Sequence, residues 1–220
     1  MSGRAQAPGG ARRAATHFKI AVLISGRGSN LQALIDDLAD SEIEIAGVAS
    51  SRPDARGLER AQAAGLETAV FSLADEPDRE KRDRALGDWL DERDVDLVVL
   101  AGFMELLTPG FIRRFSGRIV NVHPALLPAF AGLGAIAQAL EHGVKIAGVT
   151  VHFVDEGMDS GPIILQESFE VAYHRDIAGI EEQFHEVEHR LLPRAVRMIA
   201  AGRVSVDPDN PRLVRVEPDG

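Results

Sequence analysis

Short, almost uninterrupted apolar runs constrain the fold of this chain most. Residues 18–24 (FKIAVLI) and 95–100 (VDLVVL) have this character, which is typical of strands buried on both faces of a parallel sheet. After the first run, apolar residues recur at helical spacing, at Leu31, Leu34, Ile35 and Leu38. Because strand-like and helix-like segments alternate with short links, the sequence predicts an α/β fold. We expect one domain, with a mostly parallel, twisted sheet and helices on both faces.

The other elements continue this alternation until the C-terminal third. Further strands are expected at 43–49 and 68–71 and in a run ending at 123, and helices at 55–64, 78–93, 109–115, 135–142 and 180–201. Two strand-like runs, 145–154 and 163–171, have only a short loop between them, which favours an antiparallel pair. Residues 1–16 predict a disordered arm and residues 203–220 a loose tail, on either side of a domain at 17–202.

Composition excludes several classes of function. The chain has 220 residues and no Cys, so disulfides, thiolate metal sites and Cys nucleophiles are ruled out, and a reducing cytoplasm is the expected compartment. A net charge of −10 argues against a general nucleic-acid binder, although it leaves room for a local pocket for one phosphate. No apolar run approaches the roughly 18 residues of a membrane span.

A glycine-rich segment, residues 25–30 (SGRGSN), lies between the first strand and the first helix. Ser29 and Gln32 have the spacing of a capping box, which predicts that the helix begins here. The backbone amides of Gly28, Ser29 and Asn30 would then face outward at the positive end of the helix dipole, where a phosphate binds well.

The same segment matches only half of the dinucleotide-binding fingerprint. Gly26 and Gly28 are present, but Leu31 stands where the third glycine belongs. Arg52, after the second strand, would suit the 2′-phosphate of NADP. The residues alone leave open a structural turn, a monophosphate site and an NADP site, of which the monophosphate site is favoured.

Asn121 and His123 end a short β-branched run just before Pro124. Alternate side chains of a strand share a face, so this amide and this imidazole are expected to point the same way. The loop 155–162 (DEGMDSGP) is acidic and glycine-rich. It is a solvated turn, a cation site, or a means of bringing Asp159 toward a distant His, where a carboxylate favours the imidazolium and assists proton transfer.

Two other motifs have competing interpretations. Residues 185–189 (HEVEH) satisfy the H-E-x-x-H pattern of zinc peptidases, but no convincing third ligand follows, so zinc is disfavoured. His152 lies between Val151 and Phe153 in a strand-like run, where a satisfied core His is the expected role.

Taken together, five motifs resemble the folate-dependent phosphoribosylglycinamide formyltransferase family. They run from about residue 19 to residue 202 and comprise SGRGSN at 25–30, LAGFM at 100–104, NVHPALLPAF at 121–130, GVTVHFVDEGMDSGPII at 148–164 and EHRLLP at 188–193. The resemblance implies a Rossmann-like fold and formyl transfer from 10-formyltetrahydrofolate to the amine of glycinamide ribonucleotide. It implies no metal, no nucleic-acid or membrane partner, and a monomer or homodimer in the cytoplasm.

The resemblance also assigns residues to three groups. The catalytic group it implies is Asn121, His123 and Asp159. The group expected to hold the phosphate and ribonucleotide is Gly28, Ser29, Asn30, His185, Glu186, Val187 and Glu188. The folate group is Arg79, Met104, Glu105, Leu106, Leu107, Asn121, Asp155, Glu156, Gly157, Met158 and Asp159, with Arg79 on the glutamate tail.

This chain departs from the family pattern at Glu105, Ala131 and Gly134. Glu105 replaces the usual Arg, and the other two replace a Pro and a His, which should loosen the loop after Phe130. The alternatives are another formyltetrahydrofolate-dependent formyltransferase or hydrolase, an NADP-dependent reductase, a zinc hydrolase, and a folate- or nucleotide-binding module without catalysis.

Overall fold

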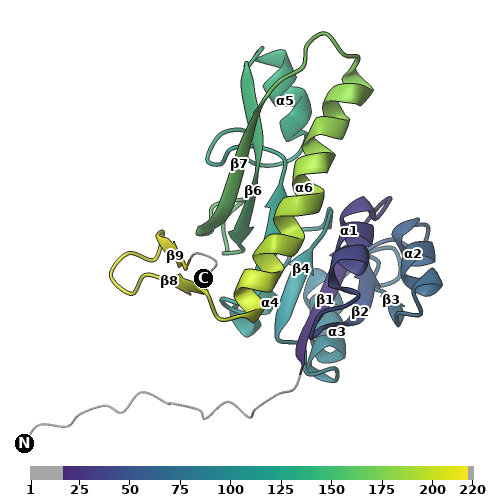
Figure 1. The fold of residues 1–220 in the computed structure, drawn as a ribbon. Coiled ribbons are helices and arrows are strands. Elements are labelled where there is room, and N and C mark those ends of the chain that lie inside the picture. Colours follow the sequence, from purple (N-terminus) through teal and green to yellow (C-terminus); the bar gives the residue numbers. More distant parts are fainter. Residues whose placement is uncertain (1–16, 218–220) are drawn as a thin grey trace, which may run out of the picture.

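A computed structural model describes residues 17–217. The predicted arm at 1–16 and the last three residues of the predicted tail lie outside the described residues. The centre of the molecule is a seven-stranded sheet in the order β3-β2-β1-β4-β5-β6-β7 (Figure 1). Its strands are β1 (Phe18–Ile24), β2 (Ile43–Ser50), β3 (Thr68–Val70), β4 (Leu97–Leu100), β5 (Ile119–His123), β6 (Ile146–Phe153) and β7 (Ile163–Glu170).

Strand direction divides the sheet into two parts. The strands from β3 to β5 are parallel to their neighbours, whereas β6 is antiparallel to both β5 and β7. The prediction of a mostly parallel sheet with an antiparallel C-terminal part is confirmed. β6 runs from the carboxyl end of β5 back to its start, so the β6–β7 loop leaves the sheet beside Ile119. From there Asp159 reaches the face of β5 that carries Asn121 and His123.

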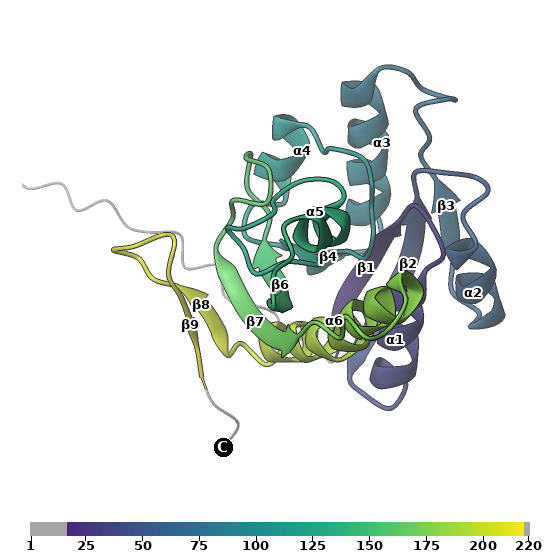
Figure 2. The same ribbon diagram turned by 90° about the horizontal axis from the view of Figure 1, so that it is seen from above.

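Helices cover both faces of the sheet, as the burial of its strands on both sides requires. They are α1 (Ser29–Leu38), α2 (Gly57–Ala63), α3 (Arg79–Asp91), α4 (Pro109–Arg114), α5 (Ala135–Glu141) and α6 (Ile177–Ala200). Apolar residues of α1, α2 and α6 form one core with one face, and those of α3 and α4 form a second core with the other face. Figure 2 shows α1 and α6 on one side of β1 and α3 and α4 on the opposite side.

Side chains cap the starts of α3, α4 and α6, whereas α1, α2 and α5 begin without a side-chain cap. Asp78 caps α3 by accepting the amides of Glu80 and Lys81, and Asp176 caps α6 by accepting the amide of Gly179. The capping box predicted for Ser29 and Gln32 is wrong. Gly28 is the N-cap of α1, and no side chain accepts a hydrogen bond from the first amides of the helix.

The long C-terminal helix has the predicted apolar face. It begins a few residues before the expected position because Asp176 supplies the cap, and its expected stripe is buried: Ile180, Phe184, Val187, Leu191 and Met198. α6 packs along α1 and β6 (Figure 1). This packing places the N-terminal half of α6 beside the start of α1.

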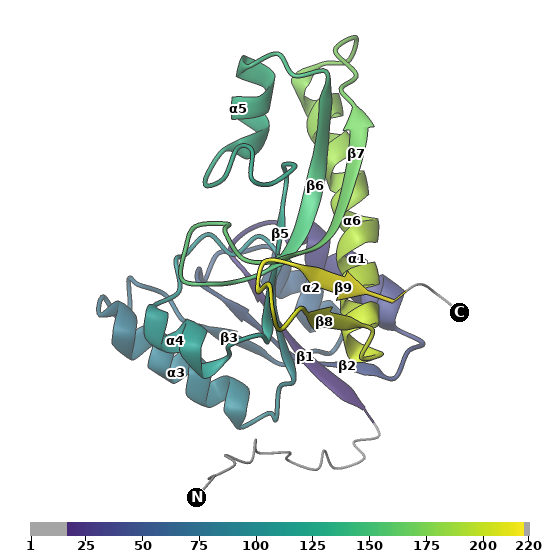
Figure 3. The same ribbon diagram turned by 90° about the vertical axis from the view of Figure 1, so that its left-hand side faces the viewer.

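The prediction of a loose tail is wrong for residues 204–216. They form an antiparallel hairpin of β8 (Val204–Val206) and β9 (Val214–Val216), which lies against β7 (Figure 3). Each short strand alternates Val with a polar residue, the period of a half-buried strand. Arg215 pairs with Asp207 across the hairpin.

Candidate active site

The carboxyl ends of β1, β4 and β5 form one edge of the sheet, the edge at which open α/β sheets bind ligands. Backbone hydrogen bonds tie two of these ends together, from Ala101 to the Leu23 carbonyl at 2.9 Å and from Ser25 to the Gly102 carbonyl at 3.1 Å. The hydroxyl of Ser25 also accepts the amide of Met104 at 2.8 Å. The SGRGSN turn and the LAGFM segment therefore lie side by side.

Asn121 and His123 share a face of β5, as predicted, while Val122 points into the core on the other side. In the antiparallel register, Asn121 is paired with His152 of β6 and His123 with Thr150. Asn121 Nδ2 lies 3.2 Å from His152 Nε2. The register thus adds a second imidazole to the predicted pair.

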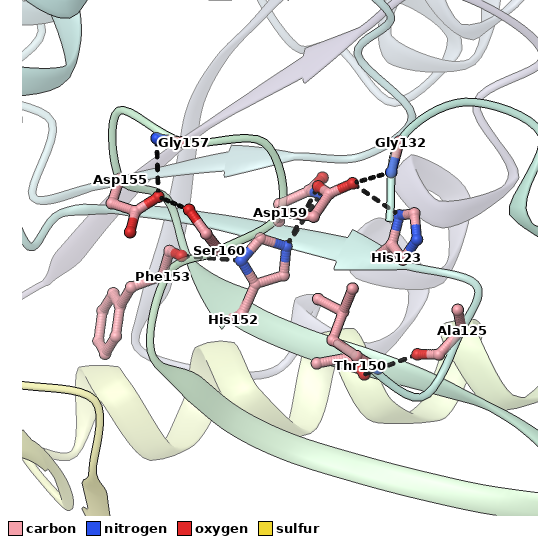
Figure 4. A network of polar contacts seen from close by, with 12 residues as sticks. His123, Ala125, Gly132, Thr150, His152, Phe153, Asp155, Gly157, Asp159 and Ser160 are labelled. Atoms are coloured by element: carbon pink, nitrogen blue, oxygen red, sulfur yellow. Dashed lines mark hydrogen bonds and ion pairs between the residues drawn. The ribbon is translucent and has the colours of Figure 1, made fainter. Parts of the chain in front are cut away.

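Asp159 reaches this face from the loop between β6 and β7 (Figure 4). Its Oδ2 lies 3.4 Å from His123 Nδ1, and its Oδ1 lies 3.6 Å from His152 Nε2 and 3.4 Å from Asn121 Nδ2. The amide of Gly132 donates to Oδ2 at 2.8 Å. The structure therefore brings together the three residues predicted to be catalytic and adds His152.

The pKa of Asp159 is lowered to about 2. The largest cause is the adjacent His152 imidazole, burial opposes it, and the Gly132 amide and the charge of His123 lower the pKa further. The carboxylate is consequently ionised throughout the neutral pH range, beside two imidazoles that can carry positive charge.

Two carbonyls fix the orientation of these imidazoles. His123 Nε2 lies 2.9 Å from the Phe130 carbonyl, and His152 Nδ1 lies 2.8 Å from the Phe153 carbonyl. Since a carbonyl only accepts, both of these nitrogens carry hydrogen. The other nitrogen of each ring faces Asp159, so a second proton on either ring converts the contact into an ion pair.

The loop that carries Asp159 has its own internal support. Asp155 Oδ1 accepts the amide of Gly157 at 3.0 Å and the hydroxyl of Ser160 at 2.6 Å (Figure 4). Arg212, in the β8–β9 hairpin, donates to the Ser160 carbonyl at 2.8 Å. The exposed Glu156 pairs with Arg113 of α4 at 2.8 Å.

A second polar cluster joins the SGRGSN turn to α6. Asn30 Nδ2 donates to Glu188 Oε2 at 3.0 Å, and His185 Nδ1 lies 3.1 Å from the same oxygen. Glu188 raises the pKa of His185, chiefly through this hydrogen bond. Asn30 Oδ1 is buried and has no hydrogen-bond partner, which leaves an acceptor available to a ligand.

Helical geometry separates the remaining residues of HEVEH. Val187 points into the apolar core, and Glu186 is exposed on the side where Arg190 pairs with Glu167 of β7. The rings of His185 and His189 are stacked, with centroids 6.1 Å apart, and burial lowers the pKa of His189. Within residues 17–217, the structure contains no group of three or more His, Asp and Glu side chains that could hold a metal ion.

The residues predicted to bind folate lie around the carboxyl end of β4 and in the β6–β7 loop. Met104 is 65% exposed, Leu106 58% and Met158 57%, whereas Leu107 is buried. Arg79, the first residue of α3, donates to the Leu106 carbonyl. Exposed apolar side chains at these two places suit a flat, partly apolar ligand.

Sequence reasoning missed two groups of this site, His152 and the amide of Gly132. The prediction that His152 is a satisfied core His is confirmed, because it is buried and both ring nitrogens have partners. One of these partners is Asn121, which brings His152 to the candidate site. No local pattern in the sequence carried this signal, because the register between β5 and β6 is what places His152 opposite Asn121. The Gly132 contact depends on loop geometry that no spacing in the sequence reveals.

Comparison with known proteins independently supports the resemblance to formyltransferases. The model of the Formyl transferase family matches residues 18–196. A phosphoribosylglycinamide formyltransferase from Haemophilus influenzae is 43% identical over 188 residues, which cover 84% of this chain and 89% of that protein. The trifunctional purine biosynthetic protein adenosine-3 of Drosophila melanogaster is 44% identical over 195 residues, or 87% of this chain, which spans only 14% of that protein.

Solved structures agree with the sequence comparison. The crystal structure of glycinamide ribonucleotide transformylase 1 from Symbiobacterium toebii has a TM-score of 0.86 at 45% identity, covering 91% of this chain and 94% of that chain. The phosphoribosylglycinamide formyltransferase of Anaplasma phagocytophilum has a TM-score of 0.85 at 38% identity, covering 92% and 95%. The chain belongs to the formyl transferase family.

Proposed function

We propose that this protein transfers the formyl group of 10-formyltetrahydrofolate to the primary amine of glycinamide ribonucleotide, a step of purine synthesis. The observation that carries the proposal is the convergence of Asn121, His123 and Asp159 at the carboxyl edge of the sheet. The names of the relatives support it, because the full-length matches are phosphoribosylglycinamide formyltransferases. Both substrates are small molecules, and we place the reaction in the cytoplasm, catalysed by a monomer or a homodimer.

Asn121 and His123 are suited to stabilise the charge that develops in this reaction. Attack of the amine nitrogen forms a bond to the formyl carbon and leaves negative charge on the formyl oxygen, which needs hydrogen-bond donors. Asn121 Nδ2 and His123 Nδ1 each lie 3.4 Å from an oxygen of Asp159, longer than a good hydrogen bond. A substrate oxygen can therefore compete for Asn121 Nδ2, and for His123 Nδ1 when the ring carries its second proton.

Asp159 is suited to assist the proton transfer that the reaction requires. The attacking amine must lose a proton, and the folate N10 must gain one as its bond to the formyl carbon breaks. With a pKa of about 2, Asp159 is anionic at neutral pH, so it acts as a hydrogen-bond acceptor and as a counter-charge whenever His123 carries its second proton. A bound water would carry the proton between the two nitrogens.

The second cluster is suited to the ribonucleotide. The first amides of α1, which no side chain caps, would hold the phosphate, with Gly28, Ser29 and Asn30 at the turn. The Glu188 carboxylate, already a hydrogen-bond acceptor for Asn30 and His185, would accept the ribose hydroxyls. Glu186 and Val187 would contribute only their backbone, since their side chains point elsewhere.

The exposed apolar residues are suited to the folate. Met104 and Leu106 would form one wall of the pterin pocket, and the 155–159 loop with Met158 the other. Arg79 would meet the glutamate tail from the start of α3, where its guanidinium is exposed beside the Leu106 carbonyl. We expect no resident metal in this reaction, because the amine is itself the nucleophile.

A panel of acceptors tests the proposal. Release of tetrahydrofolate from 10-formyltetrahydrofolate is followed by absorbance with glycinamide ribonucleotide, with methionyl-tRNA and without an acceptor. Of these three conditions, we expect release of tetrahydrofolate only with glycinamide ribonucleotide. Equal release without an acceptor would identify a hydrolase, release with methionyl-tRNA would identify the tRNA enzyme, and binding of both ligands without release would indicate a binding module. Calorimetric heat on titration with NADPH would support the reductase instead.

A further inference from the structure

Arg82 of α3 is the largest of the fully buried side chains among the described residues, with 1% exposure. Arginine is rarely buried to this extent unless its guanidinium is paired, because burying an unpaired charge costs several kcal/mol. The reaction proposed above gives this residue no role. Its partners therefore indicate what it does.

The Arg82 guanidinium and the Asp83 carboxylate hold the segment after β4 on both sides of Leu107. Arg82 Nε and Nη2 donate to Asp83 Oδ1 at 2.8 and 2.5 Å, and Nη2 also donates to the Leu106 carbonyl at 3.3 Å. The other oxygen of Asp83 accepts the amide of Thr108 at 2.6 Å. Leu107, between these two contacts, is buried. Two side chains of α3 thus fix the backbone of residues 106–108.

Glu105 provides the second carboxylate of the cluster. Its Oε2 lies 3.6 Å from Arg82 Nη1, an atom that is buried and has no hydrogen-bond partner. Glu105 is itself partly exposed, so it lies between the buried guanidinium and the solvent. An arginine at position 105 would instead bring a second positive charge against Arg82, and repulsion between like charges would push the segment outward.

We propose that Arg82 is a positioning residue for the folate pocket and that Glu105 is the counter-charge that keeps it in place. This inference rests on the proposed function for its ligand. The apolar wall of Met104 and Leu106 is held on a backbone that Arg82 and Asp83 fix, while Glu105 balances the remaining charge. An arginine at position 105, the residue usual for the family, would therefore repel Arg82 of this α3.

The variant Glu105→Arg tests the proposal, with Glu105→Gln as the neutral change and Glu42→Arg as an exposed control of the same charge change. We expect Glu105→Arg to raise the KM for 10-formyltetrahydrofolate by about 5- to 10-fold through like-charge repulsion, and Glu105→Gln by about 2-fold. The KM for the ribonucleotide and kcat should change by less than about 2-fold, since position 105 belongs neither to the ribonucleotide cluster nor to the catalytic group. Glu42→Arg should match the wild type.

Suppression by a second change separates this role from a general loss of stability. In the double variant Arg82→Met/Asp83→Asn, the buried ion pair is replaced without leaving an unpaired charge, and the side-chain amide oxygen introduced at position 83 can still accept the Thr108 amide. Adding Glu105→Arg to this background should raise the folate KM by less than about 2-fold, because the repulsion is gone. An equal rise in both backgrounds would overturn the proposal.

Amide hydrogen exchange gives a readout that does not depend on the reaction. In Glu105→Arg, exchange in a peptide covering 103–108 should be at least about 5-fold faster than in the wild type, with peptides of α1 and α6 unchanged. Unchanged exchange at 103–108 would overturn the inference. Faster exchange in a protein that neither binds 5-formyltetrahydrofolate nor transfers a formyl group would instead overturn the proposed function and with it the folate assignment.

Discussion

Asp159 Oδ2 lies 3.4 Å from His123 Nδ1, although the two residues belong to different parts of the chain. The antiparallel β6 makes this contact possible, since it runs back along β5 and brings the β6–β7 loop beside this strand. The same reversal aligns His152 with Asn121. One change of strand direction in a parallel sheet thus assembles the whole polar cluster.

Replacing His152 with Ala is expected to raise the pKa of Asp159 from about 2 toward its usual value near 4. His152 is the largest cause of the lowered pKa, so its removal should have the clearest effect. Carboxyl-carbon NMR titration measures the shift, with Asp159→Asn used to assign the resonance. An unchanged pKa of Asp159 would contradict the geometry described here.

The same lowered pKa predicts how stability depends on pH. A carboxylate with a folded-state pKa below its unfolded value stabilises the fold above about pH 4 and loses this contribution as pH falls toward 2. The free energy of unfolding of the wild type should therefore fall more steeply between pH 4 and pH 3 than that of Asp159→Asn. Urea titrations at closely spaced pH values measure the two slopes, and equal slopes would refute the prediction.

His185 should show the opposite dependence on pH. Glu188 raises the pKa of His185 above its unfolded value of about 6.5, so the stabilisation is complete below that pH and is lost as pH rises through the raised pKa. His185→Gln should cost about 0.5 kcal/mol at pH 6, the scale of a partly exposed pair, and less at pH 9. Urea unfolding at both pH values checks this, with the exposed His174→Gln as control; a cost independent of pH counts against the ion pair.

Gly28→Ala should disrupt the turn at the start of α1. Gly28 has a φ of +71°, and a Cβ there would lie 2.6 Å from the Gly57 Cα, so a side chain is strained and has no room. We expect a loss of about 1–3 kcal/mol in the free energy of unfolding. Gly26→Ala is the matched control, because a Cβ there meets nothing within 4 Å. Equal thermal denaturation of the two variants would remove the steric argument.

Elements with a strong apolar period could be predicted from the sequence, and weakly patterned ones could not. The strand of residues 18–24 has the predicted bounds, since a run of seven residues that are apolar except for Lys19 strongly favours a buried strand. The β8–β9 hairpin was missed because strands of three residues, with polar residues between the Val side chains, resemble a tail. The hairpin is held by contacts with β7, which is distant in sequence, and by the Asp207–Arg215 pair. Neither can be recognised from the local sequence pattern.

Some residues of the candidate site could likewise be predicted from the sequence, and others could not. Alternation along one strand predicts that Asn121 and His123 share a face, and the resemblance adds Asp159. The register between β5 and β6 decides that His152 joins them, and no local pattern fixes a register. The unusual Glu105 was visible in the sequence, but its meaning depends on Arg82, which only the packing of α3 brings close.

Formylation of glycinamide ribonucleotide by the His123→Ala and Asp159→Asn variants tests the central claim most directly. The measurement is kcat/KM from the release of tetrahydrofolate, with His174→Ala and Asp209→Asn as exposed controls that keep the same changes of residue. The account predicts wild-type rates for the controls and a loss of at least about 10²-fold for each of the two site variants, the scale of a positioned acid–base group. Turnover by His123→Ala and Asp159→Asn equal to that of the wild type would contradict it.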